Sequence, residues 1–132
     1  MKAATIRLVW TRAGDRCEYC GLHQDHERFF RFHVEHVIAR QHRGTDHLSN
    51  LALACHFCNA HKGTNLSAID PRSGAIVRLF DPRRQKWERH FRTVGVRIIG
   101  RTASARATVA LLRMNTRDRI ELRKAILADE RS

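Results

Sequence analysis

The chain has 132 residues, which is the usual length of one folded domain and seldom enough for two independent hydrophobic cores. Its formal net charge is +12, carried mostly by arginine, because the only lysines are Lys2, Lys62, Lys86 and Lys124. Arginine's planar fork matches phosphate oxygens and guanine edges, so composition favours nucleic acid as the partner over an anionic membrane surface or an acidic protein. No apolar run approaches the roughly 20 residues that span a bilayer, and the N-terminus lacks an apolar signal core, so we expect a soluble, cytoplasmic protein.

The first half of the chain predicts strand, loop, strand and helix in that order. A basic lead-in with a short apolar element at residues 6–10 ends at Gly14, and a tight turn follows at residues 17–21. Aromatic and β-branched residues in FFRFHVEHVI predict a strand from about residue 29 to 38, and the turn formers in RQHRGTDHLS predict a loop. LALA, at residues 51–54, predicts a second strand, and HFCNAHKG predicts a helix that ends near Gly63.

The second half predicts further strands and two closing helices. Turn residues at 70–74 and at 81–82 flank AIVRLF, which alternates as a short strand does, and VRIIG at 96–100 is another strand candidate. Apolar spacing predicts helices at about 103–114 and 117–129. The chain as a whole is therefore predicted to have an α+β fold.

Four cysteines form two CxxC pairs, Cys17 with Cys20 and Cys55 with Cys58. Two such turns can supply the four thiolates of a tetrahedral zinc site, whereas a redox function needs only one pair and usually a thioredoxin-like context. We therefore expect a structural zinc that ties the start of the unit to its last helix, with two pairs of free thiols as the alternative. Because four thiolates leave the zinc no open position, any catalysis must use another centre.

The residues between and beside the two pairs supply what a phosphodiesterase needs. Glu35 and His36 are adjacent near the end of the first predicted strand, Asn50 precedes the second, and Asn59 follows Cys58. Histidine suits the role of general base, and carboxylate and amide oxygens suit a hard divalent cation such as Mg²⁺. This spacing alone is suggestive of a nuclease.

The stretch VEHVIARQHRGTDHLSNLALACHFCNAHKG, with both CxxC pairs, resembles the HNH endonuclease motif over residues 17–63. The resemblance implies a small ββα-metal (His-Me finger) fold stabilised by a zinc that four cysteines hold, in which His36 is the general base and Asn50 holds it in place. It also implies that Glu35 and Asn59 bind one catalytic cation, and that the products carry 5′ phosphate and 3′ hydroxyl ends. Glu35 and Ala39 stand where Asp and Pro are more common in the family. Asn59 stands in place of a histidine, which favours Mg²⁺ or Mn²⁺.

Basic residues near these positions are candidates for DNA contact, and two aromatic residues have an open role. Trp87 and Phe91 either line a DNA groove or form a helix face packed on the nuclease unit. Among the other histidines, His33 is a candidate support for Glu35, His47 belongs to the polar loop, and His56 is expected to point away from the zinc. The DNA-binding candidates are Arg40, His42, Arg43, His61, Lys62, Arg83, Arg84 and Lys86.

These observations predict a single HNH nuclease domain over residues 1–132, with a motif core at 17–63 and a C-terminal strand and helix elaboration at 64–132. The expected activity is metal-dependent hydrolysis of DNA phosphodiester bonds, by nicking or by double-strand cleavage. Two alternatives stay open at this point, a noncatalytic zinc-stabilised DNA-binding module and a protein that binds or cleaves RNA.

Overall fold

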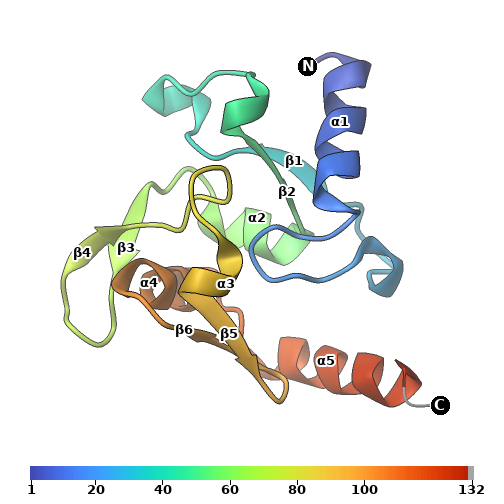
Figure 1. Cartoon of the computed structure of the whole chain (residues 1–132), viewed down its shortest axis with the longest axis vertical. Coiled ribbons are helices and arrows are strands. Elements are labelled where there is room, and N and C mark those ends of the chain that lie inside the picture. The colour runs from blue at the N-terminus through green and yellow to red at the C-terminus, as the bar shows by residue number, and fades with distance from the viewer. Residues whose placement is uncertain (131–132) are drawn as a thin grey trace.

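Two antiparallel strands and one short helix form the centre of the computed structural model, which describes residues 1–130 (Figure 1). Strand β1 (His33–His36) pairs with β2 (Leu51–Ala54), so that His36 lies opposite Leu51 and Glu35 lies opposite Ala52. Helix α2 (His56–Lys62) follows at once and packs against both strands. The predicted ββα arrangement is confirmed, and β2 has the predicted bounds.

Strand β1 is much shorter than the sequence predicts. The amide of Phe32 donates to the side-chain oxygen of Gln24 at 2.7 Å, and the amide of Phe29 donates to the carboxylate of Glu27 at 2.8 Å. These side chains satisfy the backbone that a partner strand would otherwise pair with, and β2 offers only four residues for pairing. Local hydrogen bonding therefore overrides the strand propensity of residues 29–32.

The N-terminal apolar element is a helix, α1 (Ala3–Ala13), which lies against the β1–β2 hairpin. Val9, on the inner face of this helix, is fully buried. Gly14 ends the helix in the left-handed conformation with φ 62°. The guanidinium of Arg12 donates to the carbonyls of Leu48 and Leu51 at 2.9 and 2.6 Å. Helix α1 thus holds the entry to β2 in place.

The C-terminal half contains two further hairpins and three helices within the described residues. The predicted strands near 75–80 and 96–100 and the predicted helices near 103–114 and 117–129 are present with shorter or slightly shifted bounds. The sequence does not predict β3 and β5, and it indicates α3 only through the alternative in which Trp87 and Phe91 form a helix face. Their bounds are β3 (Ser67–Ile69) paired with β4 (Ile76–Arg78), α3 (Trp87–His90), β5 (Phe91–Val94) paired with β6 (Arg97–Gly100), α4 (Ala103–Leu111) and α5 (Arg117–Glu130).

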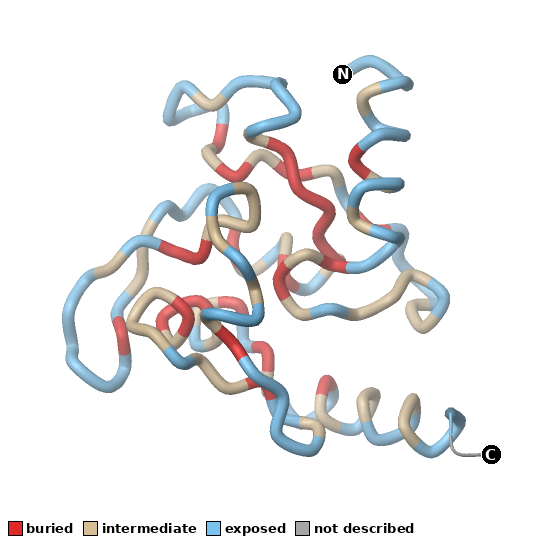
Figure 2. Tube along the Cα trace, viewed as in Figure 1, coloured by how far each residue is buried: buried red, intermediate tan, exposed pale blue. Residues whose placement is uncertain are grey.

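One cluster of buried apolar side chains joins the two halves of the chain, and β2 is buried along its whole length (Figure 2). Tyr19 and Phe80 meet edge to face within it, and Phe91 is 1% exposed. The indole of Trp87 donates to the carbonyl of Tyr19 at 2.8 Å and stacks on Phe91. Trp87 therefore packs on the first CxxC turn, and Phe91 is too buried to line a DNA groove, whereas that alternative stays a prediction for Trp87.

Single-turn 3₁₀ helices lie in the loops, at Gln24–His26, Arg40–His42 and Leu48–Asn50. The last two lie within the long loop between β1 and β2 and give it a defined path. Among the residues that the structure describes, no helix is long and apolar enough to cross a membrane.

Candidate active site and metal centre

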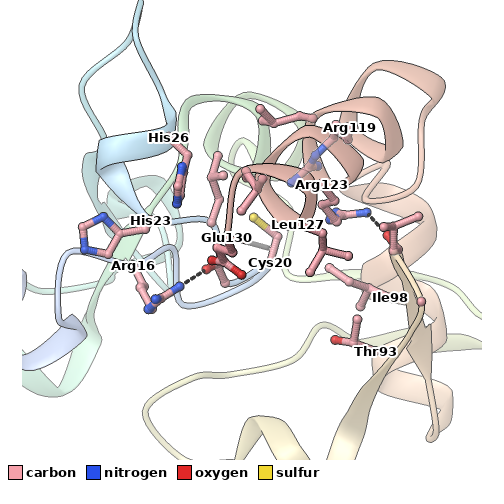
Figure 3. Close-up of a pocket in the computed structure, with 16 residues that line it drawn as sticks. Arg16, Cys20, His23, His26, Thr93, Ile98, Arg119, Arg123, Leu127 and Glu130 are labelled. Atoms are coloured by element: carbon pink, nitrogen blue, oxygen red, sulfur yellow. Dashed lines mark hydrogen bonds between the residues drawn. The ribbon is translucent and has the colours of Figure 1, made fainter. Parts of the chain in front are cut away.

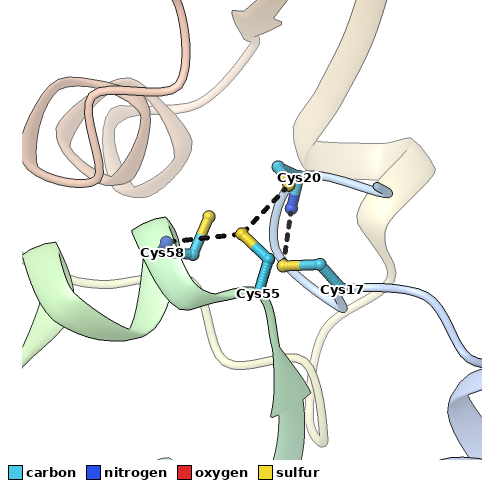
Figure 4. Close-up of side chains that lie close together, drawn as sticks. All are labelled: Cys17, Cys20, Cys55 and Cys58. Carbon is cyan, nitrogen blue, oxygen red and sulfur yellow. Dashed lines mark hydrogen bonds between the residues drawn. The ribbon is translucent and has the colours of Figure 1, made fainter. Parts of the chain in front are cut away.

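The four cysteine sulfurs lie together between the first turn and the start of α2 (Figure 4). All four sulfurs lie within 4.8 Å of one another, and the Sγ atoms of Cys20 and Cys55 are 3.7 Å apart. Four thiolates at about 2.3 Å from a tetrahedral zinc are separated by about 3.8 Å, so the cluster fits this ion. Within residues 1–130 it is the only group of three or more His, Cys, Asp or Glu side chains arranged to hold a metal.

Hydrogen bonds and one buried arginine surround the cluster. The amides of Cys20 and Cys58 each donate to the first sulfur of their own pair at 3.4 Å, the geometry of two rigid knuckles. The guanidinium of Arg119, on α5, lies 3.2 Å from the sulfur of Cys58 and also donates to the carbonyl of Leu112 at 2.8 Å. A cation at this point would offset the negative charge that four thiolates leave on a bound zinc, and the contact fixes α5 to the cluster.

Cys20 is the least buried of the four cysteines, and it lines a cavity of about 300 Å³ between the first knuckle, the β5–β6 turn and α5 (Figure 3). Arg119 and Arg123 line the same cavity, and Arg123 donates to the carbonyl of Val96 at 3.0 Å. Burial raises the pKa of Cys17, whereas hydrogen bonds with the neighbouring thiols lower the pKa of Cys20. Solvent therefore approaches the cluster from the side of Cys20.

His36 lies at the end of β1 with its ring half-buried. Its Nε2 atom is 2.7 Å from a carboxylate oxygen of Asp46, in the loop between the strands, and Arg40 donates to both oxygens of the same carboxylate at 2.9 Å. The hydrogen bond from His36 holds the pKa of Asp46 below its usual range. Because an ionised carboxylate can only accept hydrogen bonds, Nε2 of His36 carries a proton in this arrangement and Nδ1 is the nitrogen that can accept one.

Asn50 closes the loop that carries Asp46. Its side-chain oxygen accepts from the amide of Ile38 at 2.9 Å, and its side-chain nitrogen donates to the carbonyls of Ile38 and Thr45 at 3.0 and 2.8 Å. A Cβ on Gly44 would lie 1.6 Å from the carbonyl oxygen of Ile38, so only glycine fits there. Asn50 thus fixes both the residue two positions after His36 and the residue before Asp46.

Glu35 points to the other face of β1 and is almost completely buried. Its carboxylate accepts a hydrogen bond from the hydroxyl of Tyr19 and lies 3.2 Å from the ammonium of Lys62. Burial raises the pKa of Glu35, and the charge of Lys62 opposes that shift. Lys62 is 2% exposed and also donates to the carbonyl of Val37 at 3.0 Å. The burial of Lys62 removes it from the surface that can contact nucleic acid.

Asn59 lies on α2 between Cys58 and Lys62, with its side chain half-buried. Among the described residues, no hydrogen bond joins Asn59 to Glu35, although their two elements pack together. His61, two residues further along α2, has its pKa lowered by burial and by the charge of Arg113. Its neutral form is a weaker partner for phosphate than the arginines of the loop.

The β1–β2 hairpin, helix α2 and all four cysteines lie in one continuous segment of the chain. The family model described as HNH endonuclease matches residues 17–65. This segment is an HNH domain. No curated protein and no solved structure matches the chain significantly.

The basic residues around the HNH domain are partly brought together. Arg43, Arg83 and Arg84 line a cavity of about 570 Å³ beside Asn50, where the loop of the HNH domain meets the C-terminal half. The guanidinium of Arg83 pairs with Glu18 and is largely buried, so its charge is already balanced. The side chain of Arg84 is 77% exposed. Four further candidates lie at other positions: Arg40 and His42, exposed on the same loop, Lys86, exposed in the C-terminal half, and His61 on α2.

Three residues of the HNH domain and its surroundings were not singled out from the sequence, namely Tyr19, Asp46 and Arg119. Asp46 carried one clue, since it is the acidic residue in an otherwise basic loop. Tyr19 lies inside the first CxxC turn, where only the fold shows that it reaches Glu35. Arg119 is 61 residues from the sulfur that it contacts, and no local pattern indicates such a pair.

Proposed function

We propose that the protein is a metal-dependent endonuclease that hydrolyses phosphodiester bonds in DNA. The observation that carries this proposal is the pairing of His36 with Asp46 in the HNH domain, on a loop that Asn50 and Gly44 hold. A module that only binds DNA needs no such oriented base. The net charge of +12 supports a polyanionic substrate.

In this proposal, His36 takes the proton from the attacking water. Asp46 accepts a hydrogen bond from Nε2–H, which fixes the tautomer and leaves Nδ1 free to take the proton. The same contact stabilises the imidazolium that forms once the water has lost its proton. Asn50 keeps His36 and Asp46 facing each other, because it holds the backbone on both sides of the loop. This division of roles makes His36 the base and Asp46 and Asn50 its positioning residues.

The cation that the HNH domain implies would be held by Glu35 and Asn59, as one Mg²⁺ or Mn²⁺. The donor types fit, because one carboxylate oxygen and one amide oxygen, completed by water and phosphate, are ligands that hard cations prefer. Glu35 already pairs with Lys62 and Tyr19, so binding requires the carboxylate to exchange the ammonium for the metal. When bound, the ion would neutralise charge on the scissile phosphate and on the leaving oxygen.

The four cysteines would hold a structural zinc, and residues 1–132 would act as one domain. The buried cluster that joins the two halves of the chain supports the second proposal. Phosphate contacts fall to the exposed basic residues, with Arg43 and Arg84 along the cavity beside Asn50 as the strongest candidates. The remaining candidates for such contacts are Arg40, His42, Lys86 and, more weakly, His61.

Replacing Asp46 with asparagine is expected to lower the rate of DNA cleavage by about 10- to 100-fold, the usual cost of losing a partner that orients a functional histidine. The hydrogen bond of 2.7 Å from His36 then ends on a neutral amide in place of a carboxylate. The amide can donate or accept, so the tautomer of His36 is no longer fixed. Single-turnover cleavage measures the rate, and thermal unfolding shows that the fold is retained. Asp129→Asn, which removes one exposed acidic charge from α5, is the matched control. Equal rates for the two variants would remove Asp46 from the mechanism.

The class of nucleic acid is tested with matched DNA and RNA duplexes of one sequence, incubated with Mg²⁺ or Mn²⁺. We expect cleavage of DNA with 5′ phosphate and 3′ hydroxyl ends, and no cleavage when the cation is chelated. Preferential cleavage of the RNA would establish the RNA alternative instead. Tight binding of both duplexes without cleavage in any divalent cation would favour the noncatalytic binding module.

A further inference from the structure

A group of aromatic rings lies exposed around His33, at the opposite end of β1 from His36. Phe29 is 86% exposed, Phe30 is 44% exposed and Phe57, at the start of α2, is 37% exposed. Phe30 stacks on the ring of His56 at 3.9 Å between centroids and 8° between planes, and His33 lies beside His56. We call these five residues the aromatic platform. Contiguous exposed apolar surface of this kind usually marks a binding site.

The loop that presents the aromatic platform is rigid. The amides of Phe29 and Phe30 both donate to the carboxylate of Glu27, and the side chain of Gln24 bonds to the backbone on both sides of the loop. These contacts hold Phe29 outward through its backbone, while its side chain stays exposed. A backbone that hydrogen bonds already hold in place has less entropy to lose when the rings on it bind a ligand, which favours recognition over accidental exposure.

Two arginines beside the aromatic platform and the net charge of the whole chain favour an anionic partner. Arg28 and Arg31 flank the two phenylalanines and carry positive charge, and Arg31 lies over the ring of Trp10 at 4.3 Å. Two acidic residues are near: Glu27 is engaged by the loop amides, and Asp25 lies 3.6 Å from His23. The two arginines and the two acidic residues of this segment balance, so the positive charge that attracts an anionic partner is that of the whole chain, +12. Flat rings interleaved with arginine are the surface that unpaired bases and their phosphates bind.

We propose that the aromatic platform binds single-stranded nucleic acid by stacking its bases on Phe29 and on the Phe30–His56 pair. His33 begins β1 and His36 ends it, so the platform starts about 10 Å along the strand from His36, the proposed general base. A strand cleaved at His36 would thus place nearby bases on the platform, which gives the enzyme a preference for frayed, branched or single-stranded substrates. This role rests on the proposed function, whereas the stacking itself does not require catalysis.

The test measures binding of a fluorescent oligothymidylate by anisotropy in EDTA, where no cleavage occurs. Phe29→Ala is expected to weaken binding about 5- to 100-fold, the range for loss of one base–aromatic stack, while Phe29→Trp retains it. Wild type and Phe29→Ala are expected to bind an abasic oligonucleotide of the same length equally, because that polymer has phosphates but no bases. Ile76→Ala, which shortens a 76% exposed side chain on β4, is the matched control and should change neither affinity.

Three outcomes would overturn the proposal. The first is equal oligothymidylate affinity for wild type and Phe29→Ala, and the second is an equal loss of affinity for the abasic oligonucleotide. The third is a wild-type dimer that Phe29→Ala dissociates without any change in oligonucleotide affinity, which would make the platform an interface between two copies. Because EDTA separates binding from cleavage, a failure here leaves the proposed nuclease activity untouched, and an inactive enzyme leaves the stacking test intact.

Discussion

Replacing His36 with alanine is expected to abolish DNA cleavage while DNA binding is retained. A general base contributes about 10²- to 10⁴-fold to a rate, and the other side chain that pairs with Asp46 within residues 1–130 is Arg40, which cannot act as a base. The imidazole is half-buried at the end of its strand, so its loss should not disturb the fold. Single-turnover cleavage of a labelled duplex in Mg²⁺ or Mn²⁺ measures the rate, and anisotropy in EDTA measures binding.

The matched control for His36 is His47→Ala, which removes an exposed histidine from the same loop. We expect its cleavage rate to stay within about twofold of wild type, in line with ordinary surface substitutions. Cleavage by His36→Ala at the wild-type rate would exclude His36 as the base. A similar loss in both variants would point to the loop as a whole, and not to one oriented imidazole.

Loss of the metal from the cysteine cluster is expected to unfold the chain. Binding of structural zinc to zinc-finger peptides contributes about 10–16 kcal/mol, and whole domains are stable by only about 5–15 kcal/mol. Freshly purified protein should contain one zinc per chain, and chelation should remove its helical circular dichroism. Helix α5 should be lost with the rest, because Arg119 docks it on the sulfur of Cys58.

Cys58→Ser tests the same centre without a chelator, and Ala60→Ser, at an exposed position of the same helix, is its control. The first variant should lose zinc and fold, and the second should keep both. The zinc assignment would be contradicted by folded, metal-free protein in which all four thiols react freely with a disulfide reagent.

Patterns that depend on neighbouring residues predicted much of the HNH domain. The LALA run predicts the bounds of β2, since all four of its apolar residues are buried. Cys55 and Gly63 predict where α2 begins and ends. The convergence of the two CxxC pairs is likewise confirmed, since all four sulfurs lie within 4.8 Å of one another. Spacing is sufficient here because a tetrahedral site allows few alternative arrangements.

Features that depend on particular side-chain contacts escaped prediction. The side chains of Gln24 and Glu27 shorten β1, and the exposure of Phe29 follows from the same contacts. The pairing of His36 with Asp46 depends on a loop whose path is set by Asn50 and Gly44. The position of Lys62 next to Gly63 predicts a surface lysine, yet its side chain is buried in an ion pair with Glu35. In each case particular side-chain partners decide the outcome, and residue type alone does not reveal them.

Conversion of supercoiled plasmid is the measurement that tests the central claim most directly. Zinc-replete wild-type protein should convert the plasmid to nicked or linear forms in Mg²⁺ or Mn²⁺, and chelation of the cation should stop the reaction. An intact plasmid in every divalent cation, with the protein folded and bound to the DNA, would contradict the claim.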